Sequence, residues 1–264
     1  MIIGAHVDQV DPIAEAQARG TTLVQFFLGD PQGYKGPAYR YAGGAEGLRD
    51  DAAAAGIGLY VHAPYLINVA TTNNRIRIPS RKLLQQHVDG AAAIGAKGLI
   101  VHGGHLGDGE DPAIGFDNWR KAIEATELKL PVLIENTAGG DNAMTRYLER
   151  IDRVFDAISS VEGSDNVGFC LDTCHAHAGG NDLETVVADV LAITGRIDLV
   201  HCNDSRDEFD SGADRHANLG SGQIDPELLT SLVREAGAPV VLETPGGAAE
   251  HRDDIAWLAS RLLG

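Results

Sequence analysis

Eight short runs of β-branched residues alternate along this chain with longer stretches of helical periodicity, and this alternation constrains the fold most strongly. Strands separated in this way by helices are typical of parallel sheets built from repeated strand-helix units. The predicted strands cover residues 2–6, 23–28, 58–62, 98–102, 132–136, 167–172, 199–203 and 240–244. Eight repeats are enough to close a sheet on itself, so we predict an α/β protein with one (β/α)8 barrel domain spanning residues 1–264.

The stretches between the predicted strands carry helix start and stop signals. Ser80 is a candidate N-cap for the helix after it, and Asp225 with Pro226 opens a helix that Gly237 ends. Other helices are expected at residues 12–19, 45–55, 116–126, 143–158, 183–194 and 253–263. An open doubly wound sheet is the alternative, but it usually has fewer strands and often a glycine-rich first turn that this chain lacks.

Each strand from the third to the eighth ends in a side chain that can bind a metal ion. These six residues are His62, His102, Glu135, Asp172, His201 and Glu243. The carboxyl ends of barrel strands share one rim, so the six side chains should lie close together. Carboxylates that close repel one another unless protons or cations neutralise them. The sequence therefore predicts a metal site at the carboxyl end of the barrel.

Three further candidate ligands lie on loops, namely His175, Asp214 and His216. The two-residue spacing of Asp214 and His216 allows both side chains to reach one ion. Imidazole and carboxylate without thiolate favour zinc, with manganese, iron or cobalt as alternatives. Nine ligands are too many for one tetrahedral ion but fit three ions if one carboxylate bridges two of them.

The formal charge of −17 argues against a nucleic acid wrapped over the whole surface, because phosphates bind mainly to Lys and Arg. Three divalent cations would still outweigh the four site carboxylates and make the site locally positive. The chain shows no signal peptide and no apolar run of about 18 residues, so we expect a cytoplasmic protein without a membrane partner. Cys170, Cys174 and Cys202 lack a pairing pattern and are expected to be free thiols. A chain of this length can bury enough surface to be a monomer.

Six motifs together resemble endonuclease IV, the zinc-dependent apurinic/apyrimidinic endonuclease family, over essentially the whole chain. They read HAPYLIN, IENTAG, DTCH, HCNDS, DRHANLGSG and LETP, in this order. The resemblance implies a TIM barrel with three zinc ions, with Mn2+ or Fe2+ at some positions as an alternative. It places His62 and His102 on the first ion, which shares Glu135 with the second. The second ion would also take Asp172, His201 and Glu243, and the third His175, Asp214 and His216.

The activity that this resemblance implies is hydrolysis of the phosphodiester 5′ to an abasic site in double-stranded DNA, a step of base excision repair. The products would be a 3′-hydroxyl and a 5′-deoxyribose phosphate. Glu135, as the bridging carboxylate, is the candidate catalytic residue that positions or deprotonates the attacking water.

Candidate DNA contacts follow the third strand. Tyr65 and Leu66 match the family's motif and are expected to fill the gap left by a missing base. Arg75 and Arg77 belong to a basic run at residues 73–82 that is expected to bind phosphate. Arg215, between two predicted ligands, should contact phosphate or the site carboxylates.

Two segments depart from the pattern of the best-known bacterial members. The loop at residues 29–44 offers Gln32, Tyr34 and Lys35 where those members carry an arginine that probes the duplex. The fourth strand ends in HGGH rather than an HPGSH-like segment, which leaves His105 as a supporting residue. The remaining histidines are read as a hydrogen-bonded partner of the site, His6, and as surface or supporting residues, His87, His177 and His251.

A metal-dependent sugar isomerase or epimerase on the same kind of barrel is the alternative function, because this fold hosts many chemistries. Such enzymes generally hold one or two ions. The additional DTCH and DRH ligands argue against this alternative.

Overall fold

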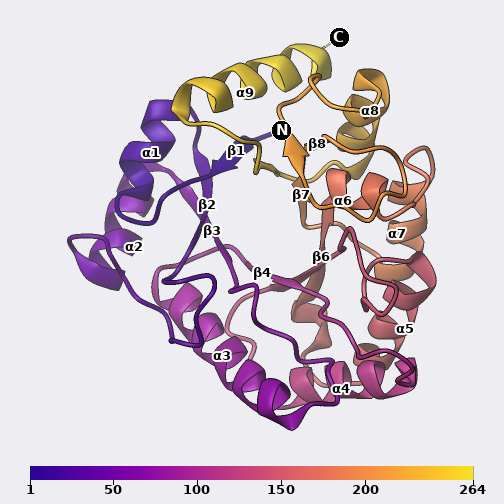
Figure 1. Cartoon of the computed structure of the whole chain (residues 1–264). Helices are drawn as coiled ribbons and strands as arrows, with labels where there is room; N and C mark the ends of the chain where they lie inside the picture. Colours follow the sequence, from indigo (N-terminus) through magenta and orange to yellow (C-terminus); the bar gives the residue numbers. More distant parts are fainter. Residues whose placement is uncertain (264) are drawn as a thin grey trace.

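The computed structural model describes residues 1–263, and eight parallel strands in it form a closed barrel in the order β1-β10-β7-β6-β5-β4-β3-β2. Figure 1 shows the helices arranged as a ring around these strands. The barrel strands are β1 Ile3–His6, β2 Leu23–Phe27, β3 Gly58–His62, β4 Leu99–His102, β5 Val132–Glu135, β6 Val167–Asp172, β7 Leu199–His201 and β10 Val240–Leu242. Residue Ile3 of β1 pairs with Val240 of β10, and this pairing closes the sheet. The prediction of a (β/α)8 barrel, and of all eight strands, is confirmed.

Helices follow the strands, and all but the short buried helix α6 cover the outside of the barrel. They are α1 Pro12–Arg19, α2 Gly44–Ala55, α3 Asn74–Ala93, α4 Pro112–Glu124, α5 Leu148–Ser159, α6 Thr173–Ala178, α7 Val186–Thr194, α8 Pro226–Ala236 and α9 Ala248–Leu262. A 3-10 turn at Ser164–Asn166 precedes β6, and a two-stranded ribbon pairs β8 Asp204–Ser205 with β9 His216–Ala217. Helix α9 packs beside α1, so the last helix lies next to the first in the ring (Figure 1).

The predicted start of the helix after the third strand is wrong. Helix α3 begins at Asn74, and the side chain of Asn73 caps it by accepting a hydrogen bond from the backbone N of Arg75. Ser80 lies inside this helix, and its Oγ accepts a hydrogen bond from the backbone N of Asn68 instead. Pro79 falls in the second turn, where its missing N–H leaves the carbonyl of Arg75 without the usual helical donor.

Several other helix ends also differ from the predictions. Asp111 and Pro112 start α4 four residues early, because the carboxylate of Asp111 caps the helix. Helix α5 begins at Leu148 rather than 143, α7 at Val186 rather than 183, and α9 at Ala248 rather than 253. Helix α8 is as predicted, since Asp225 caps it and Gly237 ends it with a φ of 62°.

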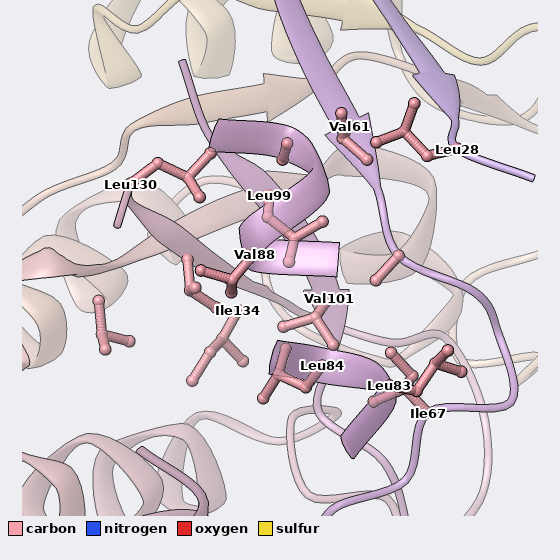
Figure 2. Close-up of a cluster of buried hydrophobic side chains, with 14 of the residues drawn as sticks. Leu28, Val61, Ile67, Leu83, Leu84, Val88, Leu99, Val101, Leu130 and Ile134 are labelled. Atoms are coloured by element: carbon pink, nitrogen blue, oxygen red, sulfur yellow. The ribbon is translucent and has the colours of Figure 1, made fainter. Parts of the chain in front are cut away.

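Alternate residues of the strands fill two different spaces. The outward residues pack against the helices, as Figure 2 shows for Leu99 and Val101 next to Leu84 and Val88 of α3. The inward residues form an interior layer inside the barrel, which consists of Leu23, Tyr60, Ile100, Leu133, Cys170, Leu199 and Val241. Because side chains alternate along a strand, the residues two positions further on also point inward, above this layer. We call them the rim layer: Gln25, His62, His102, Glu135, Asp172, His201 and Glu243.

Candidate metal centre

Six of the seven rim-layer residues are the predicted strand-end ligands, and the structure brings all six together. Glu135 is fully buried at their centre. Its Oε2 lies 3.1 Å from Nε2 of His62 and 3.2 Å from Nε2 of His102, and its Oε1 lies 3.1 Å from Nδ1 of His201. The two oxygens of one carboxylate therefore face two different groups of imidazoles, as a bridging ligand requires.

The group on the Oε1 side contains Glu135, Asp172, His201 and Glu243, whose candidate ligand atoms all lie within 4.8 Å of one another. Nδ1 of His201 is 3.4 Å from Oε2 of Glu243 and 4.0 Å from Oδ2 of Asp172. A second group, His62, His102 and Glu135, meets the same limit on the Oε2 side. These two groups match the residues expected on the first and second ions.

A third group stands beside the first two. Oδ1 of Asp214 lies 3.1 Å from Nε2 of His175 and 3.2 Å from Nε2 of His216. Asp172 also faces this group, because its Oδ2 is 3.7 Å from Nε2 of His216. Helix α6 places His175 here, since Asp172 caps the helix by accepting a hydrogen bond from its backbone N. The structure thus adds Asp172 to the predicted neighbourhood of His175, Asp214 and His216.

Backbone carbonyls orient several of these imidazoles. Nδ1 of His62 is 2.7 Å from the carbonyl of Ala63, Nδ1 of His175 is 3.0 Å from that of Asn136, and Nδ1 of His216 is 3.1 Å from that of Glu243. A carbonyl can only accept, so Nδ1–H donates in each case. The lone pair of Nε2 is then left to face the cluster, which is the arrangement found in histidine metal ligands.

The donor set fits divalent cations on two observations. Within residues 1–263, Nε2 of His175 and Nε2 of His216 are buried but have no hydrogen-bond partner, although Asp214 lies within ion-pair distance of both. Buried polar atoms without a partner are rare and point to a missing ion or water. Glu135 and Asp172 are also fully buried beside Glu243, and burial makes their charges costly unless cations neutralise them.

The pKa values in the cluster also reflect its buried negative charge. Burial raises the pKa of Glu135, but the charges of His201 and His102 outweigh it and hold that pKa well below its usual range. Burial lowers the pKa of His216, but the charge of Asp172 and the hydrogen bond with Asp214 outweigh it and raise that pKa to about 9. Without metal, protons on the imidazoles balance the carboxylates. Divalent cations are able to replace these protons.

Tyr65 lies at the edge of the cluster. Its ring is 53% exposed and its centroid is 5.7 Å from that of His62 and 5.7 Å from that of His102. The rings of Phe27 and Tyr65 pack edge to face, with their centroids 5.2 Å apart. Tyr65, Leu66 and Tyr34 line a cavity of about 820 Å3 that reaches His102. The predicted wedge residues therefore border a space next to the candidate metals.

The predicted arginine contacts are placed less uniformly. Arg75 is exposed near the start of α3, whereas the guanidinium of Arg77 donates to the carbonyls of Thr71 and Thr72. Arg215 is exposed and pairs with Asp207, which lies outside the cluster. The expected contact of Arg215 with the site carboxylates is therefore not present.

The other histidines support neighbouring loops. Nδ1 of His6 lies 3.3 Å from Oε1 of Glu243. His87, His177 and His251 are all buried, so they are supporting rather than surface residues. Nδ1 of His251 accepts a hydrogen bond from Nε of Arg19. Nε2 of His177 is 3.1 Å from the carbonyl of Asp207, and the backbone of His105 is hydrogen-bonded to the side chain of Asn68. The three cysteines are free and buried, as predicted.

Sequence reasoning missed two residues near the centre. Gln25 lies in the rim layer on β2, two residues after Leu23 of the interior layer. The alternation of side chains along the strand was the signal that could have predicted its inward position. Arg146 is buried after β5 and ties down the loop that carries Asp214. It lies 2.9 Å from Asp210 and 3.2 Å from Asp141, and it stacks on the ring of Tyr147. No local pattern marked Arg146, since its contacts with Asp210 and the carbonyl of Gly179 come from distant loops.

Among the described residues, none of the helices combines the length and the apolar character needed to cross a membrane.

Comparisons with known proteins agree with this geometry. The family model described as xylose isomerase-like TIM barrel matches residues 13–261. The chain is 55% identical to a probable endonuclease 4 of Mycobacterium bovis over 264 residues, which cover 99% of each chain. Among solved structures, endonuclease IV from Thermus thermophilus aligns with a TM-score of 0.83 and 26% identity, covering 100% of this chain and 99% of that one. A D-tagatose 3-epimerase-like protein aligns with a TM-score of 0.81 and 18% identity, covering 100% of this chain and 97% of that one, a likeness of fold.

Proposed function

Because the chain belongs to the endonuclease IV family of xylose isomerase-like TIM barrels, we propose that it is a metal-dependent DNA repair endonuclease. Its substrate is double-stranded DNA that contains an abasic site. It hydrolyses the phosphodiester 5′ to that site and leaves a 3′-hydroxyl and a 5′-deoxyribose phosphate. The observation that carries the proposal is the buried Glu135, whose two oxygens face separate imidazole groups, with a third group next to them.

Three zinc ions are proposed for the centre, with Mn2+ or Fe2+ able to occupy some positions. His62, His102 and Glu135 would hold one ion, and Glu135, Asp172, His201 and Glu243 another. His175, Asp214 and His216, beside Asp172, would hold the third. When bound, such ions neutralise phosphate charge and lower the pKa of water so that it can attack at neutral pH.

Glu135 is the candidate catalytic residue. Its carboxylate is fully buried between the groups, and its low pKa keeps it ionised. An ionised carboxylate at this position can orient an attacking water by accepting its hydrogen bond, or take its proton. Removing the negative charge of Glu135 should therefore impair both metal binding and the chemistry.

Tyr65 and Leu66 would read the lesion. An abasic nucleotide has no base to unstack, so moving it out of the duplex costs less than moving an intact nucleotide. The ring of Tyr65 can occupy the space that the missing base leaves. Burial, followed by the charges of Glu243 and Glu135, raises the pKa of Tyr65 to about 12, so the hydroxyl stays protonated and can donate a hydrogen bond.

The rest of the molecule favours a local contact with DNA. The exposed Arg75 and Arg215 are proposed to contact phosphates near the centre, Arg215 after it releases Asp207, while Arg77 holds the loop before α3. The net charge of −17 should keep the duplex away from the rest of the surface. A monomeric, single-domain protein that acts in the cytoplasm is also proposed, because one closed barrel holds all eight parallel strands and its substrate would be DNA.

The test is incision of an end-labelled duplex that carries one tetrahydrofuran abasic analogue, which resists β-elimination. We expect cleavage 5′ to the analogue, with loss of activity after metal stripping and recovery after zinc is returned. Glu135→Gln should abolish incision, whereas the matched control Glu162→Gln, at an exposed position, should not. If the fully metallated protein does not incise this duplex, the proposal is wrong. Epimerisation of a ketose by the same sample would then establish the sugar isomerase alternative.

A further inference from the structure

Gln25 is the member of the rim layer that is not a candidate ligand. It comes from β2, where it follows Leu23 of the interior layer by two residues, and it is fully buried. Its Oε1 lies 2.8 Å from Nε2 of His201. Its Nε2 lies 2.6 Å from Oε1 of Glu243 and 3.0 Å from Nδ1 of His6. A neutral amide therefore contacts two candidate ligands of the same group, His201 and Glu243.

The chemistry of the partners fixes the orientation of this amide. As a metal ligand Glu243 would be deprotonated, and its Oε1 lies 2.6 Å from Nε2 of Gln25. An ionised carboxylate only accepts hydrogen bonds, so the NH2 group of Gln25 must face it. A flipped amide would place two acceptor oxygens 2.6 Å apart, which is repulsive. Oε1 of Gln25 must then face His201.

The amide in turn fixes the proton of His201. A carbonyl oxygen cannot donate, so Nε2 of His201 must carry the hydrogen that Oε1 of Gln25 accepts. In the neutral ring this leaves the lone pair on Nδ1, which points at Glu135 and Glu243. His201 thus presents Nδ1 to the cluster, whereas His62, His102, His175 and His216 present Nε2.

We propose that Gln25 is a positioning residue that sets the metal-facing tautomer of His201 and the rotamer of Glu243, and so holds the ion between Glu135, Asp172, His201 and Glu243. The inference rests on the proposed metal-dependent function. All three hydrogen-bonding groups of the amide, two N–H and one C=O, are used by partners at this position. Losing such a partner of a metal ligand typically lowers metal affinity about 10- to 100-fold.

The first test uses Gln25→Met, which keeps the length of the side chain and removes both donors and the oxygen. Zinc per protein is measured by elemental analysis after equilibration at a series of buffered free zinc concentrations. We expect wild-type protein to bind three ions and Gln25→Met to bind one of the three about 10- to 100-fold more weakly. The matched control is Gln85→Met, because Gln85 is hydrogen-bonded on the outside of α3, away from the centre. It should bind zinc like the wild type.

A second measurement needs no variant and therefore does not depend on Gln25→Met folding. In the zinc-loaded wild type, two-bond 1H–15N spectra of the histidine rings report which ring nitrogen carries hydrogen. We expect one metal-bound ring protonated at Nε2 and four protonated at Nδ1. Five rings protonated at Nδ1, or wild-type zinc affinity at every site in Gln25→Met, would overturn the role of Gln25. If either of these overturning results is found in a protein that still incises abasic DNA, the proposed function stands and only the role of Gln25 is rejected. A wild type that binds no zinc would remove the proposed function and this inference together.

Discussion

Gly103 follows His102 directly and has no room for a side chain. A Cβ built on it would lie 2.2 Å from Oγ1 of Thr145 and 2.4 Å from its Cγ2, far inside contact distance. Neither side can easily move. Thr145 is fully buried and its Oγ1 donates to the carbonyl of Glu135, while the carbonyl of Gly103 accepts a hydrogen bond from Nε1 of the buried Trp119. Gly103→Ala should therefore strain the backbone beneath both His102 and Glu135.

The magnitude follows from two costs. Overpacking of a filled interior costs about 1–3 kcal/mol, and displacing Thr145 from the carbonyl of Glu135 costs about 1 kcal/mol more. We expect Gly103→Ala to lower the free energy of unfolding by about 2–4 kcal/mol. Gly47→Ala is the matched control, since its Cβ in α2 would meet one atom of Tyr41 at 3.9 Å and the helix gains about 0.5–1 kcal/mol from the exchange. The same substitution should have opposite signs at the two positions.

Urea unfolding followed by circular dichroism measures both variants. It should be done with zinc bound and after chelation, because a ligand that binds the folded state adds to its apparent stability. Zinc content after dialysis reports on the site itself, and Gly103→Ala should retain less zinc than Gly47→Ala. Equal stability of Gly103→Ala and wild type would refute the steric reasoning, as would a comparable loss in Gly47→Ala.

Three further predictions concern the same region. His216 has a pKa of about 9 and must lose its proton to bind a cation, so zinc affinity should rise with pH up to about 9 and zinc binding should release protons. Calorimetry in two buffers of different ionisation enthalpy tests this proton release, and binding heats that do not depend on the buffer would contradict it. In urea unfolding, Arg146→Ala should lower the free energy of unfolding by about 2 kcal/mol, whereas the exposed control Arg153→Ala should change this free energy by less than about 0.5 kcal/mol. Arg146→Ala should also weaken zinc binding near Asp214. Burial raises the pKa of Cys170 and of Cys174 to about 12, so a colorimetric thiol reagent at pH 8 should react with these thiols after unfolding, and rapid reaction of the native protein would speak against the structure.

The barrel and the meeting of the ligands were predictable because both follow from short-range periodicity. In β3 to β7 the last inward-facing residue is also the last residue of the strand, and in β10 the last inward-facing residue comes one position after the strand ends. His62 and Glu243 could therefore be placed on the barrel rim from the sequence alone. Helix ends were less predictable. Ser80 has the chemistry of an N-cap, but Asn73 captures the helix start and the loop residue Asn68 donates to Ser80.

Residues that act through tertiary contacts were harder to find. Gln25 carries neither a charge nor a metal-binding atom of the expected kind, and its importance depends on His201 and Glu243, more than 170 residues away in the sequence. Arg215 was expected to contact phosphate or the site carboxylates because of its neighbours in sequence. Asp207 is eight residues away on the other side of the loop and pairs with it instead. Sequence periodicity carries no information on such pairings.

Zinc-edge anomalous diffraction from crystals of the purified protein tests the central claim most directly, because it locates each ion and identifies its element. We expect three zinc peaks, the first between His62, His102 and Glu135, and the second between Glu135, Asp172, His201 and Glu243. The third should lie against His175, Asp214 and His216. Fewer than three peaks in zinc-saturated crystals, or strong peaks away from these residues with the cluster empty, would contradict it.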